Sequence, residues 1–345
     1  MVGPGEIARR ARSRYSGRLE SLPILALSVH SACNCRCVMC DIWKANSDKR
    51  EISGEDLERH IDSIRKLRVQ RIMLTGGEPL LHRNLWALCS RLQTLRIRIT
   101  LVTTGLLIEP HAKDIAETID TVVISVDGDR EVHDAIRRVK GGFDRIARGV
   151  MALHAEFPTP RLIARSVVQR DNYASLDRTI LAAQAMGFDE ISFLAADVSS
   201  QAFNRDVPWR EDRVSQVAID RSELGDLRSA IDRAFTAAPD LFDNGFVAGG
   251  RASLDRIHQY YSALAGAGEF PAVSCNAPWV SAVLEPNDRL RPCFFHPTYG
   301  STMDGLERAL NSDQSVAFRR SLDIATNDTC RRCVCSLNLP LTRGV

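Results

Sequence analysis

Short apolar runs alternate with amphipathic segments from about residue 24 to residue 197. The runs are rich in β-branched residues and have the length of buried strands; they cover 24–29, 71–75, 98–103, 121–125, 161–168 and 190–195. The segments between them have helical periodicity, and in one of them Ser53 is expected to cap a helix with Asp56 at the capping-box position. The pattern predicts six βα units whose strands form a parallel sheet, buried on both faces.

Polar or glycine-rich residues follow most of these predicted strands. They include GGEP (76–79), TTG (103–105), SVDG (125–128) and QRDN (169–172). Because the carboxyl ends of parallel strands converge on the active site, one site built from all of these loops is expected. Periodicity alone does not distinguish a partly closed barrel from a flat, doubly wound sheet.

The character of the chain changes after residue 197. A polar, irregular stretch is followed by helical segments to about residue 270, and short strands and cysteines continue from there to the end. We therefore expect four parts. These are an N-terminal extension (1–23), the βα region (24–197), a helical and irregular insert on the substrate side (198–270) and a cysteine-rich region (271–345).

Composition narrows the class of protein. The chain has 345 residues, 44% of them hydrophobic, with 45 basic and 43 acidic side chains, so bulk charge predicts no nucleic-acid partner. No apolar run approaches the roughly 18 residues of a membrane helix, and the apolar stretch after the arginine-rich N-terminus is too short for a signal peptide. A cytoplasmic enzyme is expected.

The ten cysteines provide the main chemical evidence. Cys89 stands alone in an apolar helical pattern and is expected to be a plain buried thiol. The other nine form two groups, at 33, 35, 37 and 40 and at 275, 293, 330, 333 and 335. A secreted disulfide framework would be a short chain with a signal peptide, so metal binding is the better interpretation.

The first group has the spacing C-x3-C-x2-C at Cys33, Cys37 and Cys40, with Cys35 as the spare thiol. Three thiolates can hold three irons of a cubane cluster and leave the fourth iron open to another ligand. A structural zinc site or incidental cysteines are the alternatives. Zinc usually takes two C-x2-C pairs or Cys/His pairs, which this single loop does not provide.

This loop after the first strand, with Gly76-Gly77-Glu78-Pro79 after the second, resembles the radical SAM superfamily. The stretch 124–146 resembles the region after the fourth strand in members that carry a cysteine-rich extension. The resemblance covers about 24–197 and 271–335. It implies a partial (β/α)6 TIM-like barrel, a [4Fe-4S] cluster on Cys33, Cys37 and Cys40, and S-adenosylmethionine (SAM) on the fourth iron.

The resemblance also implies the residues that contact SAM. Gly76, Gly77 and Glu78 would bind the methionyl amino group, and Ser125 the ribose or carboxylate. Asp127 lies in the same turn and would either contact the cofactor or cap the next segment.

Two positions depart from the family pattern. Met39 replaces a frequent aromatic residue, and its thioether is expected to cover the adenine. Thr104 stands where Asn is common, so it keeps a hydroxyl and loses an amide.

The second cysteine group resembles a twitch subdomain, the short form of the SPASM domain. Cys275-x17-Cys293 is followed after 36 residues by Cys330-x2-Cys333, which implies an auxiliary [4Fe-4S] cluster and leaves Cys335 over. The usual hairpin glycine is absent, and Asn287-Asp288 is expected to make the turn. Four cysteines would also fit zinc.

Four hypotheses for function remain open. The first is a small-molecule enzyme that abstracts hydrogen and oxidises the product radical through the auxiliary cluster; it is favoured because only about 23 residues precede the first strand. The others are a peptide maturase, a redox-neutral decarboxylase or lyase, and an electron carrier. A flavodoxin- or ferredoxin-type donor is expected. Candidate substrate-side residues are Arg165, Asp197 and His296, with Trp209, Tyr260 and Tyr261 for a peptide groove.

Overall fold

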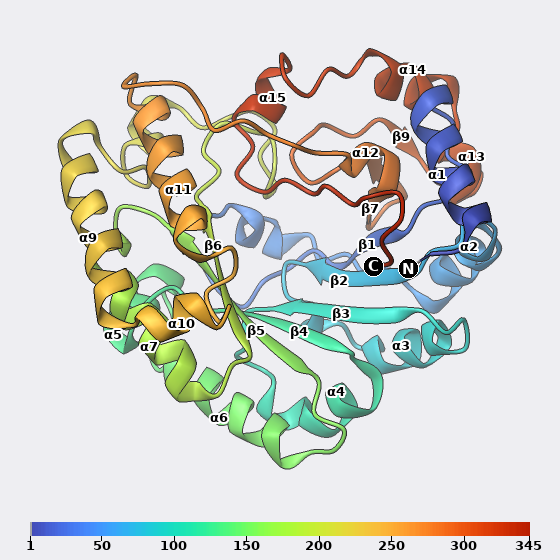
Figure 1. Cartoon of the computed structure of the whole chain (residues 1–345). Helices are drawn as coiled ribbons and strands as arrows, with labels where there is room; N and C mark the ends of the chain where they lie inside the picture. Colours follow the sequence, from blue (N-terminus) through green and yellow to red (C-terminus); the bar gives the residue numbers. More distant parts are fainter. Residues whose placement is uncertain (1) are drawn as a thin grey trace.

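The computed structural model describes residues 2–345 and contains one nine-stranded sheet in the order β6-β5-β4-β3-β2-β1-β7-β8-β9. The first six strands pair in parallel, and the sheet they form is curled with helices on its outer side (Figure 1). The predicted fold class, a partial (β/α)6 barrel with a helical insert and a cysteine-rich C-terminal region, is confirmed. The strands are β1 (Ile24–His30), β2 (Arg71–Gly76), β3 (Arg98–Thr103), β4 (Thr121–Ser125), β5 (Arg161–Val168), β6 (Glu190–Ala195), β7 (Ser281–Glu285), β8 (Arg289–Arg291) and β9 (Gly300–Ser301).

Helices follow the strands as the amphipathic pattern predicts. Ser53 and Asp56 form the expected capping box at the start of α2. The α-helices are α1 (Pro4–Ser16), α2 (Gly54–Lys66), α3 (Leu85–Gln93), α4 (Ala112–Thr118), α5 (Arg130–Arg137), α6 (Gly142–Ala155), α7 (Leu176–Met186), α8 (Glu211–Val214), α9 (Leu224–Ala237), α10 (Pro239–Asp243), α11 (Gly250–Leu264), α12 (Ala277–Val280), α13 (Leu306–Leu310), α14 (Asp313–Ser321) and α15 (Asp328–Arg331). The short 3-10 helices are η1 (Ile42–Ser47), η2 (Pro79–Leu81), η3 (Glu109–His111), η4 (Tyr173–Ser175) and η5 (Arg221–Glu223).

The two faces of the curled sheet differ in burial. Side chains on the outer face, such as Leu74 and Leu162, are fully buried against the helices. In β2, β5 and β6 every second residue points to the inner face, and the side chains of these residues are only half-buried or exposed. The prediction that all strands are buried on both faces is therefore wrong for these three, because the inside of the barrel is not filled with side chains.

The C-terminal region extends the sheet and does not form a separate layer. β7 pairs in parallel with β1, and β8 and β9 then add antiparallel strands. Asn287 and Asp288 both have positive φ, so they make the β7–β8 turn as the sequence predicts. Sequence patterns did not predict that this hairpin lies beside β1. This strand is one edge of the six-stranded part of the sheet, which does not close into a full barrel.

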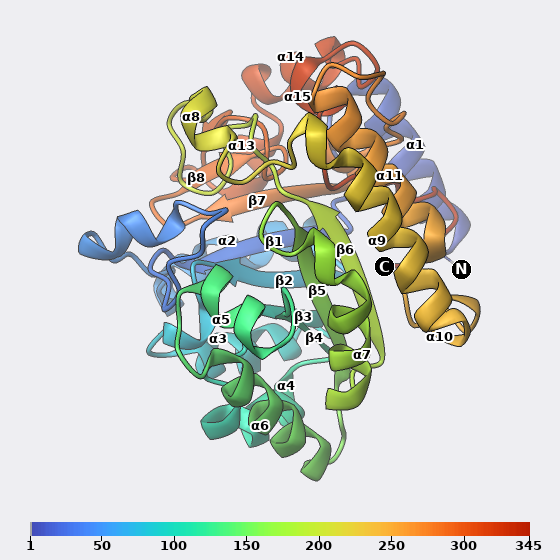
Figure 2. The ribbon, with the colours of Figure 1, turned by 90° about the vertical axis from the view of Figure 1, so that its left-hand side faces the viewer.

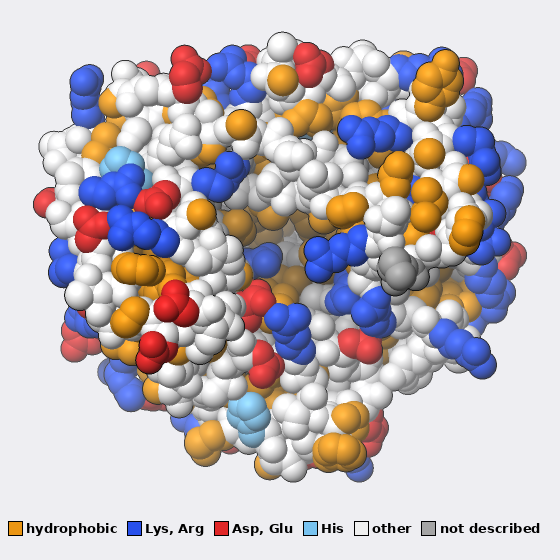
Figure 3. Space-filling model, viewed as in Figure 1, with side chains coloured by type: hydrophobic (Ala, Val, Ile, Leu, Met, Phe, Trp, Pro, Cys, Tyr) orange, Lys and Arg blue, Asp and Glu red, His pale blue; other side chains and the backbone are white. Residues whose placement is uncertain are grey.

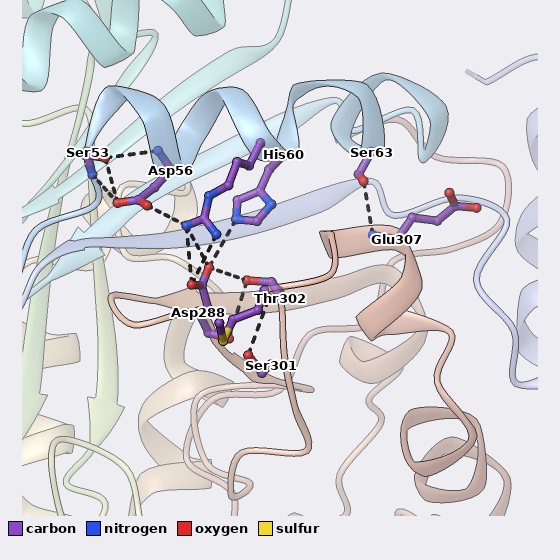
Figure 4. Close-up of polar contacts among 10 residues, drawn as sticks. Ser53, Asp56, His60, Ser63, Asp288, Ser301, Thr302 and Glu307 are labelled. Atoms are coloured by element: carbon purple, nitrogen blue, oxygen red, sulfur yellow. Dashed lines mark hydrogen bonds and ion pairs between the residues drawn. The ribbon is translucent and has the colours of Figure 1, made fainter.

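Polar contacts join the hairpin turn to α2 (Figure 4). Asp288 accepts a hydrogen bond from Arg59 (3.2 Å) and lies 3.8 Å from His60. The hydroxyl of Ser63 accepts a hydrogen bond from the backbone N–H of Glu307 (3.2 Å). Together these contacts fix the position of the C-terminal region relative to the barrel.

The two chain ends lie side by side (Figure 1), where Arg10 donates to the carbonyl of Arg343 (2.7 Å). In the insert, α9 and α11 pack against each other and against α7 and β6, so they continue the outer helical layer (Figure 2). Tyr261 is fully buried there and donates to the carbonyl of Val168 (2.6 Å). Within residues 2–345, no helix has the length and apolarity needed to cross a bilayer.

Candidate active site

The four N-terminal cysteines lie in the loop between β1 and η1, residues 31–41, called the cysteine loop below. Cys35, Cys37 and Met39 are buried in a small apolar cluster that also includes Leu106, Ile136 and Val198. This cluster is separate from the main core of the barrel. No cysteine between residues 2 and 345 forms a disulfide, and Cys89 is fully buried in the main core as the sequence predicts.

The GGEP segment holds the cysteine loop in place. The N–H groups of Gly77 and Glu78 donate to the carbonyls of His30 (2.7 Å) and Ala32 (2.9 Å). A Cβ atom on Gly76 would lie 2.3 Å from the carbonyl oxygen of His30, and one on Gly77 would lie 2.1 Å from that of Ala32. Both positions therefore require glycine, because the two loops touch through their backbones.

Glu78 is fully buried beneath this contact. Its carboxylate accepts hydrogen bonds from the N–H of Leu80 (3.0 Å), the hydroxyl of Thr103 (2.7 Å) and the N–H of Thr104 (2.6 Å). Burial raises the pKa of Glu78, and these donors oppose that effect. The side chain thus links the loops that follow β2 and β3, and its predicted contact with the amino group of SAM stays a prediction.

The thiols of the cysteine loop interact with one another and with a buried cation. Hydrogen bonds with Cys33 and Cys37 raise the pKa of Cys35. A hydrogen bond from Cys35, together with the charge of Arg137 and against the effect of burial, lowers the pKa of Cys37 to about 6. Burial and the neighbouring Cys37 raise the pKa of Cys40 to about 12. Cys37 is therefore the most readily ionised of these three thiols.

Arg137 and Asp127 form a buried ion pair directly behind Cys37. The Nε of Arg137 donates to Asp127 (2.6 Å), and its Nη1 lies 3.6 Å from the sulfur of Cys37. The second carboxylate oxygen of Asp127 accepts from the N–H of Val167 (2.8 Å), and the N–H of Asp127 donates to Nδ1 of His133 (3.2 Å). The Asp127 carboxylate thus orients Arg137. Its predicted contact with the cofactor stays a prediction, and Arg137 was not identified from the sequence.

Met39 and its neighbours suit a purine. The amide nitrogen of Gln169, from the loop after β5, lies 3.7 Å from the sulfur of Met39. The other amide atom, Oε1, is buried and has no hydrogen-bond partner among residues 2–345. Thr104 donates to the side-chain carbonyl of Asn34 (3.0 Å), and Ser125 ends β4 with its side chain half-buried. A partnerless acceptor beside a thioether fits an amino-substituted ring such as adenine.

The start of the insert, residues 198–214, covers the cysteine loop and is called the covering segment. Trp209 donates to the carboxylate of Asp41 (2.7 Å), and Arg213 donates to the carbonyl of Val38. Arg205 lies over the ring of Trp209 at 4.7 Å and forms a buried ion pair with Asp197. Asp197 is thus committed to Arg205, and Trp209 binds the loop rather than lining a free groove. Tyr260 and Tyr261 are buried as packing residues.

A cavity of about 570 Å³ opens beside this loop. It lies at the carboxyl ends of β1 and β2, next to Gly76 and Gly77, and β7 and the covering segment close its other sides. Its charged groups are Asp48, Arg50, Glu285, Arg289 and Arg291. Its place between the cysteine loop and the C-terminal hairpin is suited to a cofactor together with a substrate.

The five C-terminal cysteines line a second cavity of about 210 Å³, called the C-terminal cavity. Most of its remaining wall is apolar; part of it comes from β1, β2 and β7, and the rest from segments of the C-terminal region itself. The buried ring of His296 lies 3.3 Å from the sulfur of Cys330. Burial raises the pKa of Cys293 to about 11 and that of Cys330 to about 12. The lining cysteines are Cys275, Cys293, Cys330, Cys333 and Cys335.

The cysteine loop suits an iron–sulfur cluster, because a buried guanidinium lies beside Cys37. Among residues 2–345 no group of three or more His, Cys, Asp or Glu side chains is arranged to hold one metal ion. Tetrahedral zinc needs its sulfurs roughly 3.8 Å apart, whereas each cysteine of a cubane cluster binds a different iron. In the first group, the guanidinium of Arg137 can balance the negative charge of a cluster. In the second group, the thiols line the C-terminal cavity. Cys335, which the sequence analysis left over beside the four expected ligands, lines the same cavity as they do.

Comparison with known proteins agrees with this geometry. Residues 27–183 match the family model described as the Radical SAM superfamily. The chain is 32% identical over 136 residues to a probable GTP 3',8-cyclase of Methanopyrus kandleri (39% of this chain, 44% of that protein). It is 32% identical over 172 residues to the mycofactocin maturase MftC of Mycolicibacterium smegmatis (49% of this chain, 43% of that protein). The matches thus span less than half of either relative.

Among solved structures, SuiB of Streptococcus suis bound to S-adenosylmethionine shares the fold, with a TM-score of 0.62 at 16% identity. The likeness covers 96% of this chain and 76% of SuiB. The cysteine loop, the GGEP contact and the family match together show that the chain contains a domain of the radical SAM superfamily.

Proposed function

We propose that the protein is a radical SAM enzyme that oxidises a small-molecule substrate. When bound, the cubane cluster and SAM would supply a 5'-deoxyadenosyl radical that removes a hydrogen atom from the substrate. The substrate radical would then lose a proton to solvent and an electron to an auxiliary cluster. The observation that carries the proposal is the geometry of the cysteine loop. Its thiols lie beside a buried guanidinium, and GGEP fixes its start through backbone contacts.

The side chains have distinct roles in this proposal. Cys33, Cys37 and Cys40 would hold the first cluster, with Arg137 balancing part of its negative charge. The backbone of Gly76 and Gly77 lines the larger cavity, where the amino group of SAM would be bound. The family resemblance supports Ser125 and Thr104 as further cofactor contacts.

Met39 and Gln169 would hold the adenine, because the partnerless Oε1 of Gln169 can accept a hydrogen bond from its amino group. The covering segment binds the loop from outside through Trp209 and would keep water away from the radical.

The auxiliary cluster would occupy the C-terminal cavity. Cys275, Cys293, Cys330 and Cys333 are its proposed ligands, and support comes from their shared cavity with its largely apolar wall. A cluster with four cysteine ligands has no open iron for substrate, which favours electron transfer over substrate binding. A flavodoxin- or ferredoxin-type protein is the proposed electron donor.

The proposal is tested by anaerobic reconstitution followed by reduction with dithionite and addition of SAM. Formation of 5'-deoxyadenosine, absent without reductant and lost in Cys37→Ala, is the expected result. Complete absence of 5'-deoxyadenosine from protein that carries its iron would contradict it. For the oxidation, one SAM consumed per turnover without an external oxidant is expected once a substrate is found.

Peptide modification is the second candidate. It is favoured by the similarity to a protein named mycofactocin maturase and by the fold shared with SuiB, which has also been solved bound to the precursor peptide SuiA. A short peptide encoded beside this gene that stimulates 5'-deoxyadenosine formation would favour it over the small-molecule proposal.

A further inference from the structure

Arginine is concentrated on the inner face of the barrel. Three of the six barrel strands begin with arginine, at Arg71 in β2, Arg98 in β3 and Arg161 in β5. A fourth, Arg165, lies further along β5 on the same face. The face seen in Figure 3 is hollowed at its centre, and both Lys and Arg side chains and a few Asp and Glu side chains lie around the hollow.

Acidic side chains do not balance this charge. Within the described chain, Glu190 is the one carboxylate on the inner face of β1–β6, and it pairs with Arg161 (2.7 Å). Arg71 donates to the hydroxyl of Thr100 (2.7 Å). Burial and the charge of Arg98 lower the pKa of Arg71, while Asp120 opposes them. The inside of the barrel therefore carries surplus positive charge.

Arg165 has the most informative position. In the strand register it lies directly between Ser125 of β4 and Ser192 of β6. Its Nε donates to the hydroxyl of Ser192 (3.2 Å), and across residues 2–345 it forms no ion pair. Arg165 thus stands on the inner face of the barrel, beside the carboxyl end of β4.

We propose that Arg165 binds an anionic group of the substrate, a carboxylate or a phosphate. A half-buried guanidinium without a carboxylate partner is unfavourable until an anion pairs with it. The planar fork of arginine matches both oxyanions with two parallel hydrogen bonds. Arg71 and Arg98, which are not paired with a carboxylate in the described strands, add a positive field that draws anions into the barrel. This inference rests on the proposed function, and it narrows the substrate to anionic compounds.

Binding of pyrophosphate and of glutarate to the reconstituted protein tests the proposal. Calorimetry at constant ionic strength is expected to show saturable binding of at least one of them, and the preferred probe distinguishes phosphate from carboxylate. Affinity should fall at least tenfold in Arg165→Met and less in Arg165→Lys, which keeps the charge and loses the fork. Arg145→Met, on the exposed side of α6, is the matched control and should bind as the parent does.

Chemical modification of the parent protein is a second test, and it requires no folded variant. Phenylglyoxal should modify Arg165 in the parent protein, and the bound probe should protect it while Arg145 stays reactive. No saturable binding of either probe, or equal binding by Arg165→Met, would overturn the proposal. Formation of 5'-deoxyadenosine is measured without these anions, so failure of the anion test leaves the radical SAM assignment standing.

Discussion

The two cysteine groups differ in what surrounds their sulfurs. In the cysteine loop, Cys37 lies 3.6 Å from the guanidinium of Arg137, which is itself fixed by the buried carboxylate of Asp127. In the C-terminal cavity the wall is largely apolar, and the polar group nearest Cys330 is the ring of His296 at 3.3 Å. One group thus has a buried positive charge beside it, and the other lies in a largely apolar cavity with a histidine ring beside Cys330.

This difference shows how each site is prepared for metal. The charge of Arg137 contributes to the lowered pKa of Cys37, so part of the first ligand set is ionised near neutral pH. Burial keeps the thiols of Cys293 and Cys330 protonated until iron displaces their protons. We expect Cys37 to bind iron as a thiolate, whereas Cys40 of the same site and both Cys293 and Cys330 release a proton when iron binds.

The largest expected effect separates Cys37 from Cys35. Cys37→Ala should lose the SAM-binding cluster, because it removes one of three ligands and the thiol paired with Arg137. Cys35→Ala should keep that cluster and is the matched control. Iron content and 5'-deoxyadenosine formation measure both. Retention of the cluster in Cys37→Ala together with its loss in Cys35→Ala would reverse the assignment of ligands in this loop.

Gly77→Ala tests whether the GGEP segment positions the cysteine loop without affecting the C-terminal cysteines. Its Cβ would lie 2.1 Å from the carbonyl oxygen of Ala32, so the cysteine loop must shift. We expect at least a tenfold loss of 5'-deoxyadenosine formation, while the auxiliary iron remains. Gly54→Ala is the control, because a Cβ there meets no atom within 4 Å. Equal activity of the two variants would show that the loop contact is dispensable.

Arg137→Met removes the charge that distinguishes the two sites. It leaves Asp127 buried without its cation, which typically costs about 3–5 kcal/mol. Urea unfolding of the metal-free protein should show this loss. Arg148→Met, which breaks an exposed pair with Glu109, should cost no more than about 1 kcal/mol. A similarly small cost for Arg137→Met would mean that the buried pair does not stabilise the loop.

The smallest effect concerns pH. Burial, with the charge of Arg137, lowers the pKa of His133 to about 4, below the usual value of 6.5. The unfolded chain therefore takes up a proton before the folded one does, and stability falls as pH drops from 6.5 toward 4. The loss is up to about 3 kcal/mol. Thermal unfolding between pH 7 and 4 should show a weaker pH dependence in His133→Asn. An unchanged pH dependence would count against this explanation.

Sequence patterns predicted local features well. The six barrel strands begin at the predicted residues, and the Ser53 capping box and the Asn287-Asp288 turn form as expected. Each depends on neighbouring residues and on apolar periodicity. The family resemblance likewise located the cysteine loop and GGEP before any geometry was known.

Long-range contacts could not be predicted in this way. The pairing of β7 with β1 joins segments about 250 residues apart. The ion pair of Asp127 with Arg137, the bond from Trp209 to Asp41, and the position of Cys335 also depend on tertiary packing. The partial exposure of the inner face was not predicted, because apolar periodicity does not show whether the inside of a barrel is filled with side chains. The strand residues on this face are also mixed in polarity.

The most direct test of the two-cluster account is an iron and sulfide count on anaerobically reconstituted protein, compared with the double variant Cys330→Ala/Cys333→Ala. The account predicts about eight irons per chain in the parent and about four in the variant, with 5'-deoxyadenosine still formed by both. About four irons in the parent, unchanged in the variant, would contradict it.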